Sequence, residues 1–247
     1  HPIIEISLMI DGEVTSWENP HSPICISIPY LPSPDELKHP EAIIIWYIDN
    51  TGKLSCVSNA SYQIETGKVT FSTTHFSTYA VGYNFLNFND VASDTWYFKA
   101  VSFIAAREIT TGTGGGTTYS PDAKLTRGDF IVLMMRAYGI TPDVNPVDNF
   151  ADAGNTYYTG YLAAAKRLGL SSGIGNDMYA PENLITRQEM FTLLFNGLRL
   201  INQLPQGDSG KTPSNFTDNA HIASWAQEAI TLFVKTGTVG GSNGKLT

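Results

Sequence analysis

The chain has 247 residues, 42% of them hydrophobic, and its 15 Lys and Arg against 23 Asp and Glu give a formal net charge of -8. This length exceeds the usual size of one domain, and the hydrophobic content is sufficient for two cores. An acidic chain without a basic stripe is not expected to bind nucleic acid, and no apolar run reaches the ~20 residues that span a membrane.

The first third of the chain has the residue pattern of β-strands. Apolar residues alternate with polar ones at 4–10 and at 24–28, and 42–48 is a nearly continuous apolar run. Asp11-Gly12 predicts a hairpin turn between strands. Further strands are expected at 68–73 and 78–81. About six or seven short strands predict a small β-sandwich.

Two cysteines, Cys25 and Cys56, fall on different predicted strands. Two buried thiols and a disulfide are both compatible with this placement, because a sequence does not show whether the two strands adjoin. No histidine and cysteine spacing typical of a metal site occurs, so neither a metal nor a cofactor is expected.

The rest of the chain is predicted to be helical and contains two similar helix starts sixty residues apart. Each is a capping box, in which the N-cap threonine accepts from the N3 amide and the N3 acid accepts from the N-cap amide. Each box also has an arginine at the first helical position, where a cation opposes the helix dipole, so its repetition indicates an anion site. The cap residues are Thr126 and Asp129, and Thr186 and Glu189; the arginines are Arg127 and Arg187.

The two boxes belong to a longer repeat. A Phe-x-Asp triplet occurs three times, and in each unit an aromatic residue stands sixteen positions before a glycine, with helical periodicity between them. The same spacing places a third box beyond residue 247, so we expect the third unit to be incomplete. The recurring residues are Asp90, Asp152 and Asp218; Trp96, Tyr157 and Trp225; and Gly112, Gly173 and Gly241.

Three units in register resemble the S-layer homology domain, whose copies usually come in threes in exported bacterial surface proteins. The resemblance covers residues 86–247 and rests on the Phe-x-Asp openings, the aromatic residue before an Ala-rich helix, the Gly turn and Thr-Arg-x-acid. It implies an all-α bundle with a pseudo-threefold arrangement. It also implies non-covalent binding of secondary cell wall polymer in grooves between repeats, often through a pyruvate ketal on an amino sugar.

The implied ligand agrees with the residues, because a pyruvate ketal carries a carboxylate that a guanidinium can bind bidentately. Arg127 and Arg187 are therefore the expected ligand contacts, and the recurring aspartates, aromatics and glycines complete the expected ligand-binding set. Each has an alternative: an Asp before a helix is often a cap, and an aromatic at the head of an amphipathic helix is usually in the core. Gly128 and Asp129, where the family has Ala and Glu, weaken the first box.

These patterns predict an α+β multidomain chain. The expected parts are a β-sandwich at 1–84, a first repeat at 85–140, a second at 147–204, a linker at 205–215 and an incomplete third repeat at 216–247. Residues 207–212 resemble the end of a phosphate-binding loop, but Pro205 stands where that motif requires its first glycine, and Pro213 prevents a helix directly after it. No catalytic residue is expected.

The expected function is extracellular: non-covalent anchoring of an exported surface protein to the bacterial cell wall or S-layer, without membrane insertion. Two alternatives stay open. The chain could be a fragment of a surface polysaccharide-processing enzyme whose catalytic domain lies upstream. It could also be a structural S-layer assembly protein that associates through its incomplete third repeat.

Overall fold

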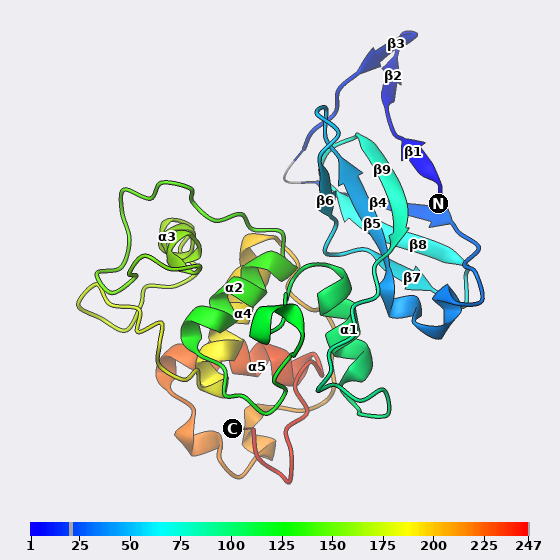
Figure 1. The fold of residues 1–247 in the computed structure, drawn as a ribbon. Helices are drawn as coiled ribbons and strands as arrows, with labels where there is room; N and C mark the ends of the chain where they lie inside the picture. Colours follow the sequence, from blue (N-terminus) through cyan, green and yellow to red (C-terminus); the bar gives the residue numbers. More distant parts are fainter. Residues whose placement is uncertain (20–21, 247) are drawn as a thin grey trace. The chain divides into compact units, whose positions relative to one another are not determined.

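A computed structural model describes residues 1–19 and 22–246. The chain is α+β, as predicted, and divides into two compact units at residues 1–123 and 124–247. Figure 1 shows the strands in the first unit together with α1 (Phe98–Ala106). The second unit contains α2 (Arg127–Ala137), α3 (Thr159–Arg167), α4 (Arg187–Leu200) and α5 (Gln227–Lys235).

Two antiparallel sheets share one core in the first unit. The four-stranded sheet has the order β1 (Ile3–Glu5), β9 (Thr78–Tyr83), β5 (Ile43–Ile48) and β6 (Leu54–Cys56). The three-stranded sheet has the order β4 (Ile24–Pro29), β8 (Lys68–Thr73) and β7 (Ser61–Gln63). Alternate side chains of both sheets are buried between them, among them Val69 and Phe71 of β8 and Tyr79 and Val81 of β9.

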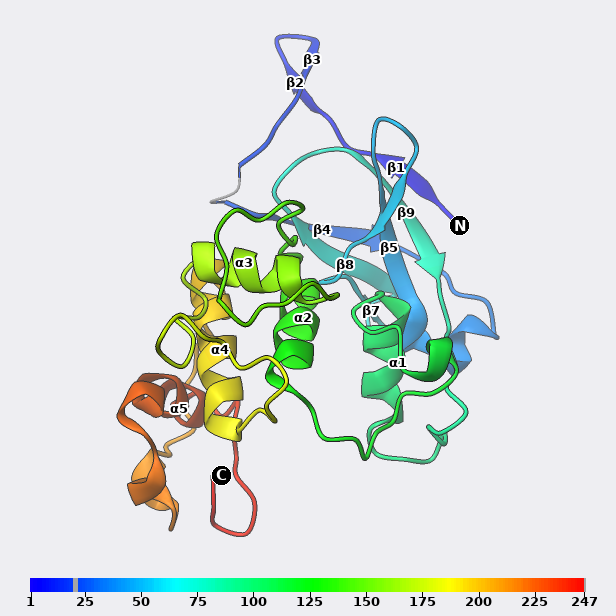
Figure 2. The ribbon, with the colours of Figure 1, turned by 60° about the vertical axis from the view of Figure 1, so that its left-hand side comes forward.

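The alternating run at 4–10 is divided between two partners. After β1, the amide of Ile6 donates to the carbonyl of Ser77 (3.0 Å), and the chain then leaves the sheet. It continues as β2 (Leu8–Ile10), which pairs with β3 (Glu13–Thr15) through the predicted hairpin turn. Figure 2 shows this hairpin standing clear of the two sheets. Alternation of apolar and polar residues shows only that the two faces of a strand differ, so it did not reveal that β1 pairs with β9 and β2 with β3.

The two cysteines lie in different sheets and are free thiols. Cys25 is exposed on β4, whereas Cys56 is partly buried at the end of β6. Burial raises the pKa of the Cys56 thiol to about 12, so this group stays protonated near neutral pH. The cysteines are therefore unpaired, but the expectation of two buried thiols is wrong for Cys25, which is exposed.

In the second unit, α4 contributes to two apolar clusters. Leu193 packs with residues of α2 and α3, such as Met135 and Leu162. Phe191 and Phe195, on the same helix, pack with residues of α5. Because it packs against both clusters, α4 is buried on more than one side.

The same turn follows the first helix of each repeat, with a glycine six residues after the last residue of α1, α3 or α5: Gly112, Gly173 and Gly241. All three glycines have positive φ, at +70°, +75° and +67°. At each of them an added Cβ would collide with a backbone carbonyl and with the phenylalanine ring of the Phe-x-Asp triplet, which is Phe216 in the third repeat. The turn therefore excludes any side chain, because both the backbone conformation and the close approach demand glycine.

Gly241→Ala is expected to destabilise the second unit. The new Cβ would lie 2.5 Å from the Lys245 carbonyl and 2.6 Å from Phe216 Cε1. With the cost of positive φ added, we expect a loss of about 1–3 kcal/mol in urea unfolding.

The matched control is Gly240→Ala, one residue earlier, where an added Cβ meets no atom within 4 Å. It is expected to change stability by less than about 0.5 kcal/mol. Equal losses in the two variants would contradict the proposed role of the Gly241 turn.

Candidate functional site

Both predicted capping boxes are present and begin α2 and α4. In the first, Thr126 Oγ1 accepts from the Asp129 amide (3.1 Å) and Asp129 accepts from the Thr126 amide (3.3 Å). In the second, Thr186 and Glu189 form the same pair of bonds, at 3.3 and 2.8 Å. The boxes set an arginine at the first residue of each helix.

Arg127 is buried, with only 5% of its surface exposed. Its Nε donates to the Tyr179 carbonyl (2.9 Å), its Nη1 forms an ion pair with Glu189, and its guanidinium lies 4.6 Å from the centre of the Tyr179 ring. The charge of Arg127 is thus neutralised by the N3 acid of the second box. The sequence predicts a ligand contact at this residue, and the structure places it in an ion pair that joins the first box to the second repeat.

Arg187 makes the same backbone contact in a different environment. Its Nε donates to the Leu246 carbonyl (3.0 Å), and its guanidinium lies 5.2 Å from the centre of the Phe191 ring. The side chain is exposed, and within residues 1–19 and 22–246 no carboxylate forms an ion pair with it. Arg187 is therefore an exposed cation, whereas Arg127 is buried in an ion pair.

The three recurring aromatic residues lie on the surface and not in the core. Trp96, Tyr157 and Trp225 are 92%, 59% and 55% exposed. The residue after Tyr157, Tyr158, and the residue after Trp225, Ala226, are buried instead. These three aromatic side chains are therefore exposed to solvent.

Two contacts bring these aromatic positions to the box of the preceding repeat. The hydroxyl of Tyr157 donates to Asp129 of the first box. Gln188 of the second box donates to the His221 carbonyl (3.0 Å) and accepts from the Ala223 amide (2.8 Å), which holds the segment before Trp225. Gln188 was not predicted as a site residue. Its place in the box, beside Arg187, was the signal in the sequence.

The recurring aspartates hold backbone amides. Asp90 accepts from the amides of Tyr119 (2.8 Å) and Ser120 (2.7 Å), and Asp152 accepts from those of Tyr179 (2.8 Å) and Ala180 (2.7 Å). Asp218 accepts from the Leu246 amide with both oxygens, at 2.9 and 3.1 Å. We call this arrangement the Asp clamp. It fixes the loop after each glycine turn, and in the second unit it presents the carbonyl that the preceding arginine binds.

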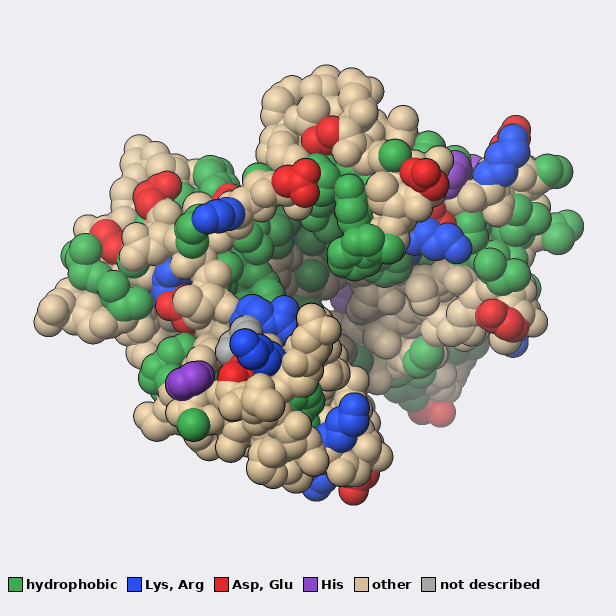
Figure 3. All heavy atoms as spheres, turned by 90° about the horizontal axis from the view of Figure 1, so that it is seen from below, with side chains coloured by type: hydrophobic (Ala, Val, Ile, Leu, Met, Phe, Trp, Pro, Cys, Tyr) green, Lys and Arg blue, Asp and Glu red, His purple; other side chains and the backbone are tan. Residues whose placement is uncertain are grey.

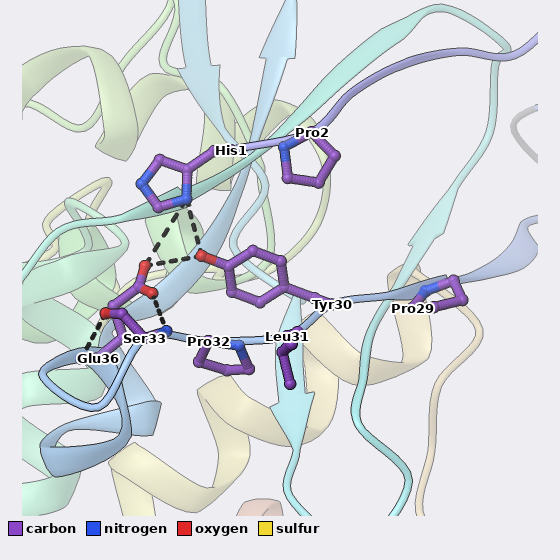
Figure 4. Close-up of a pocket in the computed structure, with 8 residues that line it drawn as sticks. All are labelled: His1, Pro2, Pro29, Tyr30, Leu31, Pro32, Ser33 and Glu36. Atoms are coloured by element: carbon purple, nitrogen blue, oxygen red, sulfur yellow. Dashed lines mark hydrogen bonds and ion pairs between the residues drawn. The ribbon is translucent and has the colours of Figure 1, made fainter.

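A shallow hollow on the first unit contains none of these residues. The Tyr30 hydroxyl donates to Glu36 (2.7 Å), and the Ser33 amide donates to the other oxygen of Glu36 (2.7 Å). Burial and the bond to Glu36 raise the pKa of Tyr30. The polar groups of the hollow bind one another, and we assign it no ligand. Its lining, drawn in Figure 4, is His1, Pro2, Pro29, Tyr30, Leu31, Pro32, Ser33 and Glu36.

Charge on the surface is local. On the face drawn in Figure 3, the Lys and Arg side chains form separate spots and one small group, without a continuous basic stripe. In the parts of the chain that the structure describes, no group of three His, Cys, Asp or Glu side chains could hold a metal ion. No helix among these residues is long and apolar enough to cross a membrane.

Asp90→Asn is expected to weaken the acid dependence of stability in the first unit. The amides of Tyr119 and Ser120 lower the pKa of Asp90 below its usual 3.8. A lowered folded pKa means that the stabilisation is complete above the unfolded value and is lost as pH falls through the folded value.

Unfolding of the wild type and of Asp90→Asn should therefore be compared between about pH 2 and pH 5. The stability difference is expected to shrink towards the acid end. Asp122→Asn, which lies outside the Asp clamp, is the control. A difference that stays constant over this range would contradict the role assigned to Asp90.

The buried ion pair of Arg127 and Glu189 is expected to show strong coupling in a double-mutant cycle. Arg127→Ala and Glu189→Gln should interact by about 1–3 kcal/mol, because removing either leaves its partner with an unmatched charge. The exposed pair Arg167 and Asp143 joins at 2.6 Å and serves as the control, with coupling below about 1 kcal/mol. Coupling at the buried pair no larger than at this control would show that Glu189 does not neutralise Arg127.

Residues 87–131 and 149–191 match the S-layer homology domain family. The amylopullulanase of Thermoanaerobacterium thermosulfurigenes is 28% identical over 203 residues, which are 82% of this chain and 11% of that protein. S-layer protein EA1 of Bacillus anthracis is 24% identical over 159 residues, 64% of this chain and 18% of that protein. The endoglucanase of Bacillus sp. (strain KSM-635) is 28% identical over 148 residues, 60% of this chain and 15% of that protein.

The chain thus spans less than a fifth of the length of these relatives. The S-layer relatives and the family match together indicate an extracellular location at the cell surface. They also indicate a role in surface anchoring. Each matched segment contains one glycine turn, one Asp clamp and one capping box, whereas the third turn and clamp lie outside both segments. The chain therefore carries S-layer homology domain repeats at residues 87–131 and 149–191.

Proposed function

We propose that this chain anchors a surface protein non-covalently by binding an acidic cell wall polymer at Arg187. The observation that carries the proposal is the exposed guanidinium of Arg187 at the start of α4, without a carboxylate partner among the described residues. The site would lie between the second and third repeats, within residues 124–247. The finer architecture belongs to the same proposal: a β-sandwich followed by a pseudo-threefold bundle of three repeats.

The ion pair at Arg127 supports a carboxylate as the group that Arg187 binds. There, a carboxylate from the chain itself occupies Nη1 while Nε is held by a backbone carbonyl. Arg187 has the same Nε contact to a backbone carbonyl, that of Leu246. A carboxylate on a pyruvylated amino sugar could take the corresponding place, with charge-assisted hydrogen bonds.

Trp225 supports a sugar as the carrier of that carboxylate. More than half of its surface is exposed, and Gln188 holds the preceding segment against the second box. An exposed indole offers an apolar face on which a sugar ring can stack. The arginine and the tryptophan would then recognise the acidic group and the ring of one residue of the polymer.

The first box is less suited to an acidic ligand. Arg127 is neutralised by Glu189, and Asp129 adds a carboxylate that accepts from the exposed Tyr157. A second anion would be repelled by these groups. We therefore propose unequal sites, with the second box as the stronger one.

Arg187→Ala is expected to weaken binding of purified, pyruvylated wall polymer by about 10–100-fold, the loss of one charge-assisted contact. Binding is measured by isothermal titration calorimetry. Arg199→Ala is the matched control, because this exposed arginine also lies on α4 and also stands 5.2 Å from the centre of a phenylalanine ring.

Arg199→Ala should bind the polymer like the wild type. Neither protein should bind polymer from which the pyruvyl groups have been removed. Wild-type affinity in Arg187→Ala would overturn the site. Equal binding of the polymer with and without pyruvyl groups would overturn the carboxylate as the recognised group.

A second proposal concerns the longer protein. The 203 residues aligned with the amylopullulanase exceed the span 86–247, so that likeness extends into the β-domain. We propose that the whole protein is a surface enzyme that processes a polysaccharide in a domain outside this chain. Hydrolysis of α-glucan by the full-length protein, and not by residues 1–247, would support it; absence of hydrolysis in both would contradict it.

Self-association through the third repeat stays a prediction that analytical ultracentrifugation tests.

A further inference from the structure

Arg107 is a buried cation whose hydrogen bonds all go to backbone carbonyls. It follows the last residue of α1 and is 3% exposed. Its Nε and Nη2 donate to the Ala60 carbonyl (3.0 and 2.6 Å), and Nη2 also donates to Ile43 (3.1 Å). Its Nη1 donates to Glu41 (2.8 Å) and Phe103 (3.0 Å). A guanidinium has five N–H groups in a fixed fork, and these contacts use all of its nitrogens.

Three of the four acceptor residues belong to the β-domain. Ile43 is the first residue of β5, Glu41 lies in the 3-10 turn Pro40–Ala42 before it, and Ala60 precedes β7. Burial lowers the pKa of Arg107 to about 10, so the group is still charged near neutral pH. A charged side chain is buried only where its donors are satisfied, and here the β-domain supplies the acceptors.

The other repeats do not have this arrangement. Counting back from the glycine turns, the position of Arg107 is occupied by Leu168 in the second repeat and Thr236 in the third. The position before it is Ala106 in α1, which is fully buried, but Arg167 in α3, whose side chain is 58% exposed. Where α3 ends in the exposed Arg167, α1 therefore ends in the buried Ala106, followed by the buried guanidinium of Arg107.

The junction between β9 and α1 is packed as well. The Asn84 amide donates to the Ala42 carbonyl (3.0 Å), and its side chain donates to the Ala106 carbonyl (2.8 Å). Phe85 stacks on His39 with ring centres 4.0 Å apart. The segment that composition marks as the border of two modules is thus held to both sides.

We propose that the end of α1 is a rigid joint, in which Arg107 fixes the β-domain to the first helix of the first repeat. The β-domain and α1 then move as one body, and no flexible linker separates them. Its orientation relative to α1 is set by three backbone carbonyls, and a force on the β-domain passes to the repeat through them. The joint does not depend on polymer binding.

The test is a distance measurement between two spin labels in the full chain. One label is placed on the native Cys25, which is exposed on β4, and the other on Lys99→Cys, an exposed position of α1. Cys56 stays unlabelled, because its partly buried thiol remains protonated near neutral pH. Pulsed electron paramagnetic resonance then gives the distribution of distances between β-domain and α1.

The wild type is expected to show one narrow distribution. Arg107→Leu introduces the residue type that the second repeat has at this position, Leu168, and should broaden the distance distribution. Arg107→Lys should also broaden it, because an ammonium cannot replace the planar, five-donor guanidinium. Lys235→Leu removes a cation from the end of α5 and is the control; its distribution should stay narrow. A narrow distribution in Arg107→Leu, with wild-type circular dichroism, would overturn the joint.

Hydrogen exchange of the wild type decides the matter if Arg107→Leu does not fold. A rigid joint requires that the most protected amides of β5 and α1 exchange through one common opening, with the same dependence on denaturant. Separate openings of β5 and α1 would show two independent modules and would refute the proposal.

Discussion

The structure of the repeats depends on one loop residue that is held from both sides. In the second repeat this residue is Tyr179: its amide is bound by Asp152 of its own repeat and its carbonyl by Arg127 of the preceding box. Leu246 is held in the same way by Asp218 and Arg187. The glycine turn is required because only a residue without Cβ lets the loop come close enough to be clamped. The arginine of each box is thus held by a backbone carbonyl of the next repeat, and at Arg127 the Tyr179 ring adds a side-chain contact.

This shared contact separates two uses of the same arginine. At both boxes the arginine Nε donates to a backbone carbonyl of the next repeat, so the Nη groups remain for a nearby carboxylate. At Arg127 that acid is Glu189, and the result is a buried ion pair inside the second unit. At Arg187 the guanidinium is exposed, beside a segment that carries an exposed tryptophan. One motif therefore accounts for a structural link and for the proposed ligand contact.

The first repeat is divided between the two compact units although it is continuous in sequence. Its first helix belongs to the compact unit with the sheets, and its capped helix belongs to the unit of residues 124–247. Arg107 and Ala106 explain the first part of this division, because they turn the end of α1 into an interface for the β-domain. A boundary at residue 84, where the composition changes, does not coincide with the division into compact units.

The sequence by itself determined the features that local rules govern: the alternating strands, the Asp11-Gly12 hairpin, the capping boxes and the glycine turns. It also identified the recurring Asp and aromatic positions, since repetition is visible without coordinates. It did not decide what the aspartates bind, whether the aromatic rings are exposed, or that Arg127 and Arg187 differ. Those outcomes depend on groups that lie 27 to 62 positions away, such as the amide of Tyr179 for Asp152 and the carboxylate of Glu189 for Arg127. Burial and partnership of a charge are set by the packing of distant segments, and only the tertiary structure brings those segments together.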